Sequence, residues 1–298
     1  MTAFMGGRHR QQHKARLMDT TTVATHQKYF SDFAQALRYW RGKRGHSQLR
    51  LSADSRISQR HISFLESGRA QPSRALILKL GTVLDIPLRQ RNVMLLAAGF
   101  APAYQERKLS DPELAAVKQA LDFMLAQQAP FPALVVDRLW NLQMANGPAV
   151  MLIRWLLGVP DGQALPLKGA NVLRLMLDPA GLRPFIVNRA EVSSDLLQWI
   201  QREAMSDGPG SESTALLEEL VALAGPEAAA PATNLDARSL PFLTVMICKD
   251  DVTLNLFTSI TTMGTPHDVT VHELRIEHFF PADAATEAWF RTRASASA

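Results

Sequence analysis

Residues 47–69 read SQLRLSADSRISQRHISFLESGR, and they predict two short helices joined by a turn. Ser47 and Ser58 each stand at a helix N-cap, where the hydroxyl accepts a hydrogen bond from a backbone N–H of the first turn. In the second helix, expected from Gln59 to Glu66, Ile62 and Leu65 share one face and must be buried. A helix pair of this kind is typical of a helix-turn-helix, whose second helix enters the major groove of DNA.

The side chains turned away from that core have the chemistry of base and phosphate contacts. Glutamine bonds adenine, arginine bonds guanine, and an aromatic ring touches the thymine methyl group. Hydroxyls and basic groups at helix starts and turns contact phosphates. We expect the DNA-binding residues to be Arg44, Ser47, Gln48, Ser58, Gln59, Arg60, Ser63, Phe64 and Arg69.

Charge is divided unevenly along the chain. Residues 1–110 hold 19 Lys and Arg against 6 Asp and Glu, a balance of +13, whereas residues 111–298 have a balance of −9. Such asymmetry indicates that the first half meets a polyanion and the second does not. A basic half that is merely soluble is the alternative.

Apolar side chains recur at helical spacing over residues 31–100, where five short helices fit. Residues 1–28 are polar and basic, and we interpret them as a disordered arm. We therefore expect a helix-turn-helix domain at 29–103, a linker at 104–112 and a second domain at 113–298.

The second half changes character and contains strand patterns. Residues 132–137 and 140–144 predict a hairpin, and 242–248, 253–261 and 269–277 are rich in Val, Ile, Thr and Phe. Amphipathic helices are expected between the hairpin and the third strand. The simplest assembly is an antiparallel sheet of five strands with helices inserted after the second. The fold class is α+β, an all-α domain followed by this sheet.

The first domain strongly resembles the XRE family of helix-turn-helix regulators, which includes lambdoid phage repressors. The resemblance runs from about Phe33 to Ile86, with Ser47-Gln48, Ile62-Ser63, Leu65–Arg69 and Pro72-Ser73 as matching residues. It implies a five-helix, lambda-repressor-like domain that binds DNA sequence-specifically. It also implies a structural ion pair between Arg41 and Glu66. Phe64 departs from the pattern, because phage repressors often place a polar base-reading residue there.

A subgroup of these regulators is similar over nearly the whole chain from residue 31. Leu88–Asn92, Leu95–Pro102 and Pro132–Asn141, followed by Asn146, carry the resemblance. In that subgroup an MmyB-like ligand-binding domain of PAS-like fold follows the helix-turn-helix. The resemblance implies a hydrophobic pocket for a lipid-like molecule such as a fatty acid.

Apolar residues on the expected sheet and helices are candidates to enclose that pocket, although each is otherwise an ordinary residue of a close-packed core. They are Phe123, Met124, Trp140, Leu152, Trp155, Leu156, Leu173, Met176, Phe242, Val245, Phe257 and Ile260. Arg138, Arg154 or Arg174 could hold a carboxylate head group, and each is otherwise a solvated surface charge.

Signals of catalysis are absent from the sequence. It has no Gly-rich phosphate loop, nucleophile elbow or paired cysteines, so we expect neither an enzyme nor a cofactor. His267, His272, Glu273, Glu277 and His278 are metal-ligand types. However, His272 and Glu273 would point to opposite faces of an expected strand, so no metal site is predicted.

The single cysteine, Cys248, is expected in the core and fits a reducing compartment. No apolar run is long enough to span a bilayer. The sequence thus predicts a cytoplasmic homodimeric transcription regulator that binds an operator and a small apolar ligand. In the alternative, the second domain has a filled core and serves as a dimerisation or partner-binding module. An enzyme fused to a DNA-targeting module would need a polar constellation that the second half does not show.

Overall fold

The computed structural model describes residues 30, 32–160, 162–165, 167–207, 211–225, 244–264 and 266–296. The chain divides into two compact units, one up to Ala103 and one from Tyr104. The expected N-terminal arm and Phe242 lie outside the described residues.

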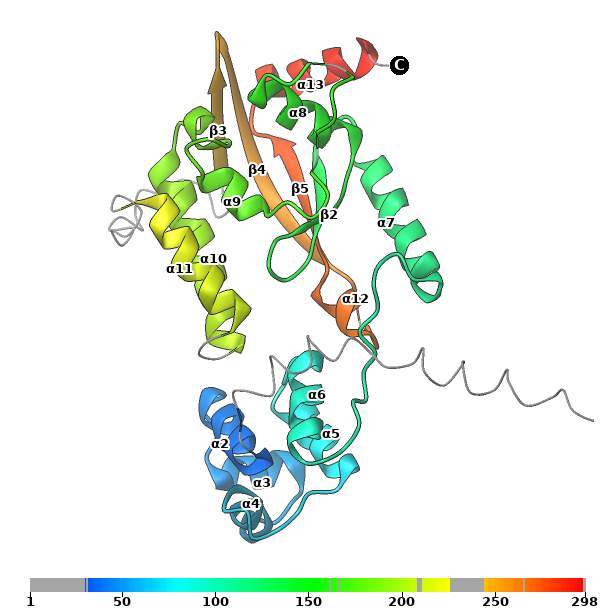
Figure 1. The fold of residues 1–298 in the computed structure, drawn as a ribbon, viewed down its shortest axis with the longest axis vertical. Coiled ribbons are helices and arrows are strands. Elements are labelled where there is room, and N and C mark those ends of the chain that lie inside the picture. Colours follow the sequence, from blue (N-terminus) through cyan, green and yellow to red (C-terminus); the bar gives the residue numbers. More distant parts are fainter. Residues whose placement is uncertain are drawn as a thin grey trace, which may run out of the picture. The chain divides into compact units, whose positions relative to one another are not determined.

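Five helices form the described part of the first unit (Figure 1). They are α2 (Phe33–Lys43), α3 (Gln48–Ser55), α4 (Gln59–Glu66), α5 (Arg74–Val83) and α6 (Leu88–Ala97). The first four each begin at a side chain that accepts a backbone N–H of the first turn, from Asp32, Ser47, Ser58 and Ser73. Their buried faces meet around Trp40, Leu51 and Ile62. The expected five-helix domain is confirmed.

The second unit contains one antiparallel sheet in the order β2-β1-β5-β4-β3. Its elements are η1 (Pro112–Leu114), α7 (Ala115–Gln127), β1 (Ala133–Val136), β2 (Leu142–Ala145), α8 (Gly147–Leu157), α9 (Val172–Leu177), η2 (Arg183–Phe185), α10 (Arg189–Asp207), α11 (Glu212–Ala224), β3 (Thr244–Lys249), β4 (Val252–Thr262), α12 (Val269–Glu273), β5 (Arg275–Pro281) and α13 (Ala284–Ala296). Helices α8 to α11 are inserted between β2 and β3. This arrangement confirms the expected PAS-like fold class.

Strand alternation divides the apolar side chains of the second unit between the two faces of the sheet. Leu134 and Val136 of β1 belong to the larger core, which includes side chains of α8 to α11 and Phe290 of α13. Ala133 and Val135 belong to a smaller core with Leu121 of α7. We call the first face the cavity face, because it encloses the cavity described below.

Residues 269–273 form a helix, so the expected strand 269–277 was wrong in its first half. The Asp268 carboxylate accepts hydrogen bonds from the backbone N–H groups of Thr270 and Val271, at 2.9 and 3.4 Å. This cap supports one helical turn in β-branched residues that favour strands. His272 therefore lies on α12, and β5 begins only at Arg275.

Cys248 differs from the prediction, and residues of the expected linker contact α12. The Gln105 carbonyl accepts the Val269 N–H at 2.8 Å, and Arg107 Nη1 lies 2.9 Å from Asp268 Oδ2. The beginning of the linker is thus fixed to α12. Cys248 is exposed, because strand alternation places its neighbour Ile247 on the cavity face.

Candidate functional site

Helix α4 presents the residues expected to contact bases. Gln59 and Arg60 are exposed and Ser63 and Phe64 are half-buried, whereas Ile62 is fully buried. The Arg60 guanidinium lies over the Phe64 ring, 5.3 Å from its centroid. The guanidinium and the aromatic ring thus lie together on α4, and the exposed Gln59 amide at the start of the same helix completes the residue types that read base edges.

The expected phosphate contacts lie at helix starts and just after α4. Ser47 Oγ accepts the Arg50 N–H at 3.0 Å, and Ser58 Oγ accepts the His61 N–H at 3.3 Å. Each hydroxyl can still donate its own hydrogen to a phosphate oxygen. Arg69 is exposed two residues beyond the α4 cap.

Arg44 and Gln48 are held within the first unit. Arg44 Nε donates to the Leu84 carbonyl at 2.9 Å, and its Nη2 donates to the Asp85 carbonyl. Gln48 Nε2 donates to Glu66 Oε2 at 2.7 Å. For these two residues the sequence pattern did not reveal the competing partners within the domain, because those partners lie 18 to 41 residues away along the chain.

Arg41 and Glu66 meet as a bidentate pair. Arg41 Nε lies 2.5 Å from Glu66 Oε1 and Nη2 lies 3.1 Å from Oε2, while Nη1 donates to the His46 carbonyl at 2.8 Å. The Glu66 side chain is only 5% exposed. With Gln48 donating to the same carboxylate, this group joins α2, α3 and α4.

An apolar cavity of about 60 Å³ lies between the cavity face of the sheet and the helices that follow β2. All its lining residues are apolar: Pro132, Leu134, Leu142, Ala149, Leu152, Ile153, Leu156, Leu167, Ala170, Val172, Leu175, Met176, Leu182, Val245, Ile247, Leu256 and Phe279. Four expected ligand-binding residues, Leu152, Leu156, Met176 and Val245, are among them.

Three other expected residues belong to the core of the cavity face without lining the cavity. Trp140 is buried edge-on against Trp199, with ring centroids 5.2 Å apart. Leu173 is fully buried. Trp155 packs against Trp289, 5.0 Å between centroids, with Lys249 Nζ 5.7 Å from its ring.

Four further expected residues lie away from the cavity. Met124 packs in the smaller core, and Phe123, the preceding residue of α7, is 66% exposed. Phe257 stacks on Phe280, 5.2 Å between centroids, on the face opposite to its neighbour Leu256. Ile260 is 39% exposed towards the end of β4. Apolar character alone did not distinguish these positions from cavity positions.

The three arginines considered for a head group are engaged elsewhere. Arg138 is buried and pairs with Asp207 and with Glu212, the latter at 2.7 Å. The other two also have partners: Arg174 pairs with Glu219 at 2.6 Å, and Arg154 donates to the Pro160 and Gln163 carbonyls at 2.6 and 2.9 Å. None of the three lines the cavity.

Glu277 was not predicted to take part in the ligand site. It lies on β5, in register with Leu134 of β1 and Ile260 of β4, and is 5% exposed. Burial raises the pKa of its carboxyl to about 8, while a hydrogen bond with the Thr258 hydroxyl acts in the opposite direction. The signal in the sequence was an acidic residue within the strand-like segment 269–277.

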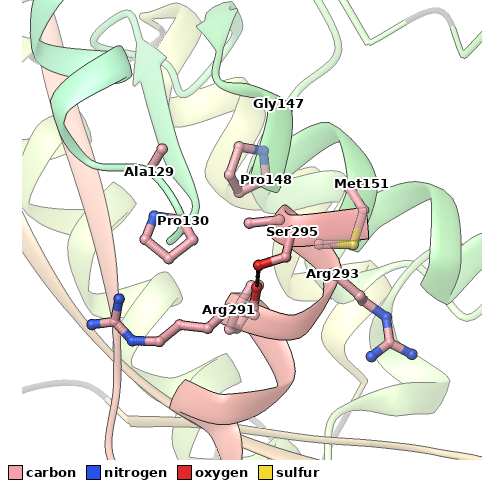
Figure 2. A pocket seen from close by; sticks show the side chains of 10 residues that line it. Ala129, Pro130, Gly147, Pro148, Met151, Arg291, Arg293 and Ser295 are labelled. Atoms are coloured by element: carbon pink, nitrogen blue, oxygen red, sulfur yellow. Dashed lines mark hydrogen bonds between the residues drawn. The ribbon is translucent and has the colours of Figure 1, made fainter. Parts of the chain in front are cut away.

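A second hollow opens at the surface between the start of α8 and the end of α13 (Figure 2). It measures about 670 Å³ and is lined by Ala129, Pro130, Gly147, Pro148, Met151, Phe290, Arg291, Arg293, Ala294 and Ser295. Figure 2 shows the Arg291 and Arg293 side chains extending in opposite directions. Arg291 also pairs with Glu287 at 2.8 Å. The neighbours Met151 and Leu152 thus line different spaces.

Within the described ranges, no helix is long and apolar enough to cross a membrane. The same part of the chain holds no group of three His, Cys, Asp or Glu side chains placed to bind a metal ion.

Two protein families match this chain. Residues 37–90 match the family described as helix-turn-helix, and residues 117–292 match the MmyB-like transcription regulator ligand binding domain. No curated protein matches the chain.

Two solved structures show a distant likeness to the chain. The PAS domain of BvgS from Bordetella pertussis is 13% identical, with 60% of this chain and 98% of that chain covered and a TM-score of 0.25. An RNA-binding light-oxygen-voltage receptor is 14% identical, with 99% and 69% covered and a TM-score of 0.25. Scores this low support no inference about this chain.

Proposed function

We propose that the ligand of this chain is a small aliphatic molecule, a fatty acid or similar lipid. The chain belongs to the MmyB-like transcription regulators, because residues 117–292 match the ligand-binding domain of that family. The chain is a DNA-binding transcription regulator with a ligand-binding C-terminal domain. Both matched families are transcription-regulator domains.

The entirely apolar lining of the cavity is the observation that carries this proposal. Ligand sites are mostly apolar, with few polar groups, and leucine and methionine side chains adapt to flexible chains. At about 60 Å³ the cavity has room for roughly four to six water molecules. Sites for drug-sized ligands measure roughly 300–1,000 Å³. An acyl chain therefore enters only if Leu152, Met176 and their neighbours move apart.

The DNA-binding part of the proposal rests on the outward side of α4. Gln59 and Arg60 read base edges, while Ser58 and Arg69 contact phosphates. The regulator acts in the cytoplasm as a homodimer on a two-fold related operator, since helix-turn-helix dimers bind paired half-sites. Ligand changes operator affinity by binding one dimer arrangement more tightly than the other.

Two measurements test the ligand. The purified chain is extracted with organic solvent for mass spectrometry, and its thermal stability is titrated with fatty acids from hexanoic to palmitic. We expect a bound lipid, and stabilisation of about 2.7 kcal/mol at a hundredfold excess of ligand over the dissociation constant. Leu152→Trp should abolish the stabilisation by filling the cavity. Met151→Trp, one residue away in the open hollow, should keep it and serves as the control.

The small volume of the cavity favours a second function. A nearly filled core suits a dimerisation or partner-binding module that takes no ligand. A lipid-free extract, together with no stabilisation by any fatty acid, would establish this function and contradict the first.

A further inference from the structure

The cavity face of the sheet carries two hydrogen-bonding side chains, one on β4 and one on β5, each next to a residue that lines the cavity. On β4, Leu256 lines the cavity and Thr258 is the next residue on the same face. On β5, Phe279 lines the cavity and Glu277 is the next residue on that face. Leu134 lies in register with Glu277 and also lines the cavity. Thr258 and Glu277 are not among the residues that line the cavity, but they follow lining residues on the same face and so place a polar group beside one end of the apolar lining.

The chemistry of this polar end is that of an uncharged acid. Glu277 is 5% exposed and hydrogen-bonded to the Thr258 hydroxyl, and burial raises its pKa to about 8. The carboxyl is thus protonated at neutral pH. A protonated carboxyl has an O–H to donate, and with the Thr258 hydroxyl satisfying an acceptor oxygen that hydrogen is available to a ligand.

We propose that Glu277 and Thr258 bind the head group of the ligand and select an aliphatic chain that ends in an uncharged oxygen group. Alcohols, esters and protonated fatty acids have this chemistry. A carboxylate anion in the same place would need a cation to offset its desolvation. Arg138, Arg154 and Arg174 are each engaged by other groups of the chain. The inference rests on the proposed function and narrows the ligand that it takes.

The test compares probes with and without a head group. Affinities of the full chain for 1-octanol, octane and octanoate are measured at neutral pH, for the wild type and for Glu277→Leu, Glu277→Gln and Thr258→Val. Glu277→Leu should weaken octanol binding by about threefold to tenfold, the value of one neutral hydrogen bond, and leave octane binding unchanged. Glu277→Gln, which keeps a donor, should bind octanol like the wild type. Octanoate should bind more weakly than octanol.

Several results would overturn the assignment of the head-group site. Among them are unchanged octanol binding in both Glu277→Leu and Thr258→Val, an equal loss of octanol and octane binding, or tighter binding of octanoate than of octanol. Thr258→Val preserves the size of the side chain, so it supplies the result if Glu277→Leu does not fold. A wild-type chain that binds none of the three probes would instead overturn the proposed function, and this inference with it.

Discussion

Glu277 makes the stability of the second unit depend on pH. Burial raises the pKa of its carboxyl from the ordinary 4.5 to about 8, so the unfolded chain releases this proton first as pH rises. The free energy of unfolding should therefore fall between pH 4.5 and about 8, by up to about 1.4 kcal/mol per pH unit, and this contribution should be constant outside that window. Glu277→Gln should remove this slope.

Urea unfolding of the full chain across that pH range gives the measurement. Burial also raises the pKa of Glu203 and lowers that of His278. Both groups are present in the wild type and in the variant, so their contributions to the pH dependence of stability are common to the two proteins. Only the difference between the two proteins reports Glu277. If the free energies of unfolding of the two proteins change in parallel with pH, the carboxyl is ionised or solvated in the folded chain.

Gln59 and Arg60 should set sequence preference. Replacing both by Ala should relax discrimination at neighbouring base pairs, by about 1–3 kcal/mol for each bidentate side chain removed from a base. The measurement is selection from a random pool of duplexes, followed by titration of selected and scrambled sites at fixed salt. Arg69→Ala is the control, because a side chain that binds only phosphate strengthens binding to all sequences alike. A double variant that keeps full preference would assign base reading to another surface.

The three helices α2, α3 and α4 meet at one carboxylate. Glu66→Ala leaves Arg41 and Gln48 without their partner in a largely buried site, and breaking a buried pair costs about 3–5 kcal/mol. Hydrogen exchange of α2 and α4 in the full chain should accelerate accordingly. Asp54→Ala removes only half-exposed pairs with His46 and Arg50, so it should cost less than about 1 kcal/mol. Equal protection in both variants would show that Glu66 is solvated.

Helix α12 depends on one cap. Asp268→Ala should destabilise this turn by about 1 kcal/mol, since it removes the acceptor of two backbone N–H groups, and it also removes the ion pair with Arg107. Asp268→Asn keeps a good cap and removes the charge. Hydrogen exchange at residues 105–108 and 269–273 should rise most in the alanine variant. If the two variants exchange alike, the ion pair rather than the cap holds this segment.

The elements that could be predicted are those with their own local signals. Ser47 and Ser58 marked two helices of the DNA-binding domain, a short apolar run marked β1, and alternation marked β2. Helix α12 could not be predicted, because its β-branched residues favour a strand and only the Asp268 cap reverses that preference. Leu152 lines the cavity as expected, whereas Phe257 was expected there and lies on the opposite face of the sheet. Composition does not say on which face of a sheet a residue lies.

The partition of charge follows the partition of the chain into two units. The basic half contains the DNA-binding helices, and the acidic half contains the apolar cavity. A ligand in one unit affects DNA binding by the other only through a difference in affinity between two states of the molecule. Tight ligand binding alone changes nothing.

Coupling between the two sites must be reciprocal. If a saturating fatty acid changes operator affinity by some factor, saturating operator DNA must change fatty-acid affinity by the same factor, typically about 5-fold to 150-fold. Both factors are measured on the full chain. Operator DNA is titrated with and without the best-binding fatty acid, and the fatty acid is titrated with and without operator DNA. Leu152→Trp should bring both factors to one while operator binding itself persists, and Met151→Trp should leave both unchanged. A ligand that binds the wild type tightly but leaves operator affinity unchanged would make the cavity a binding site without a regulatory role.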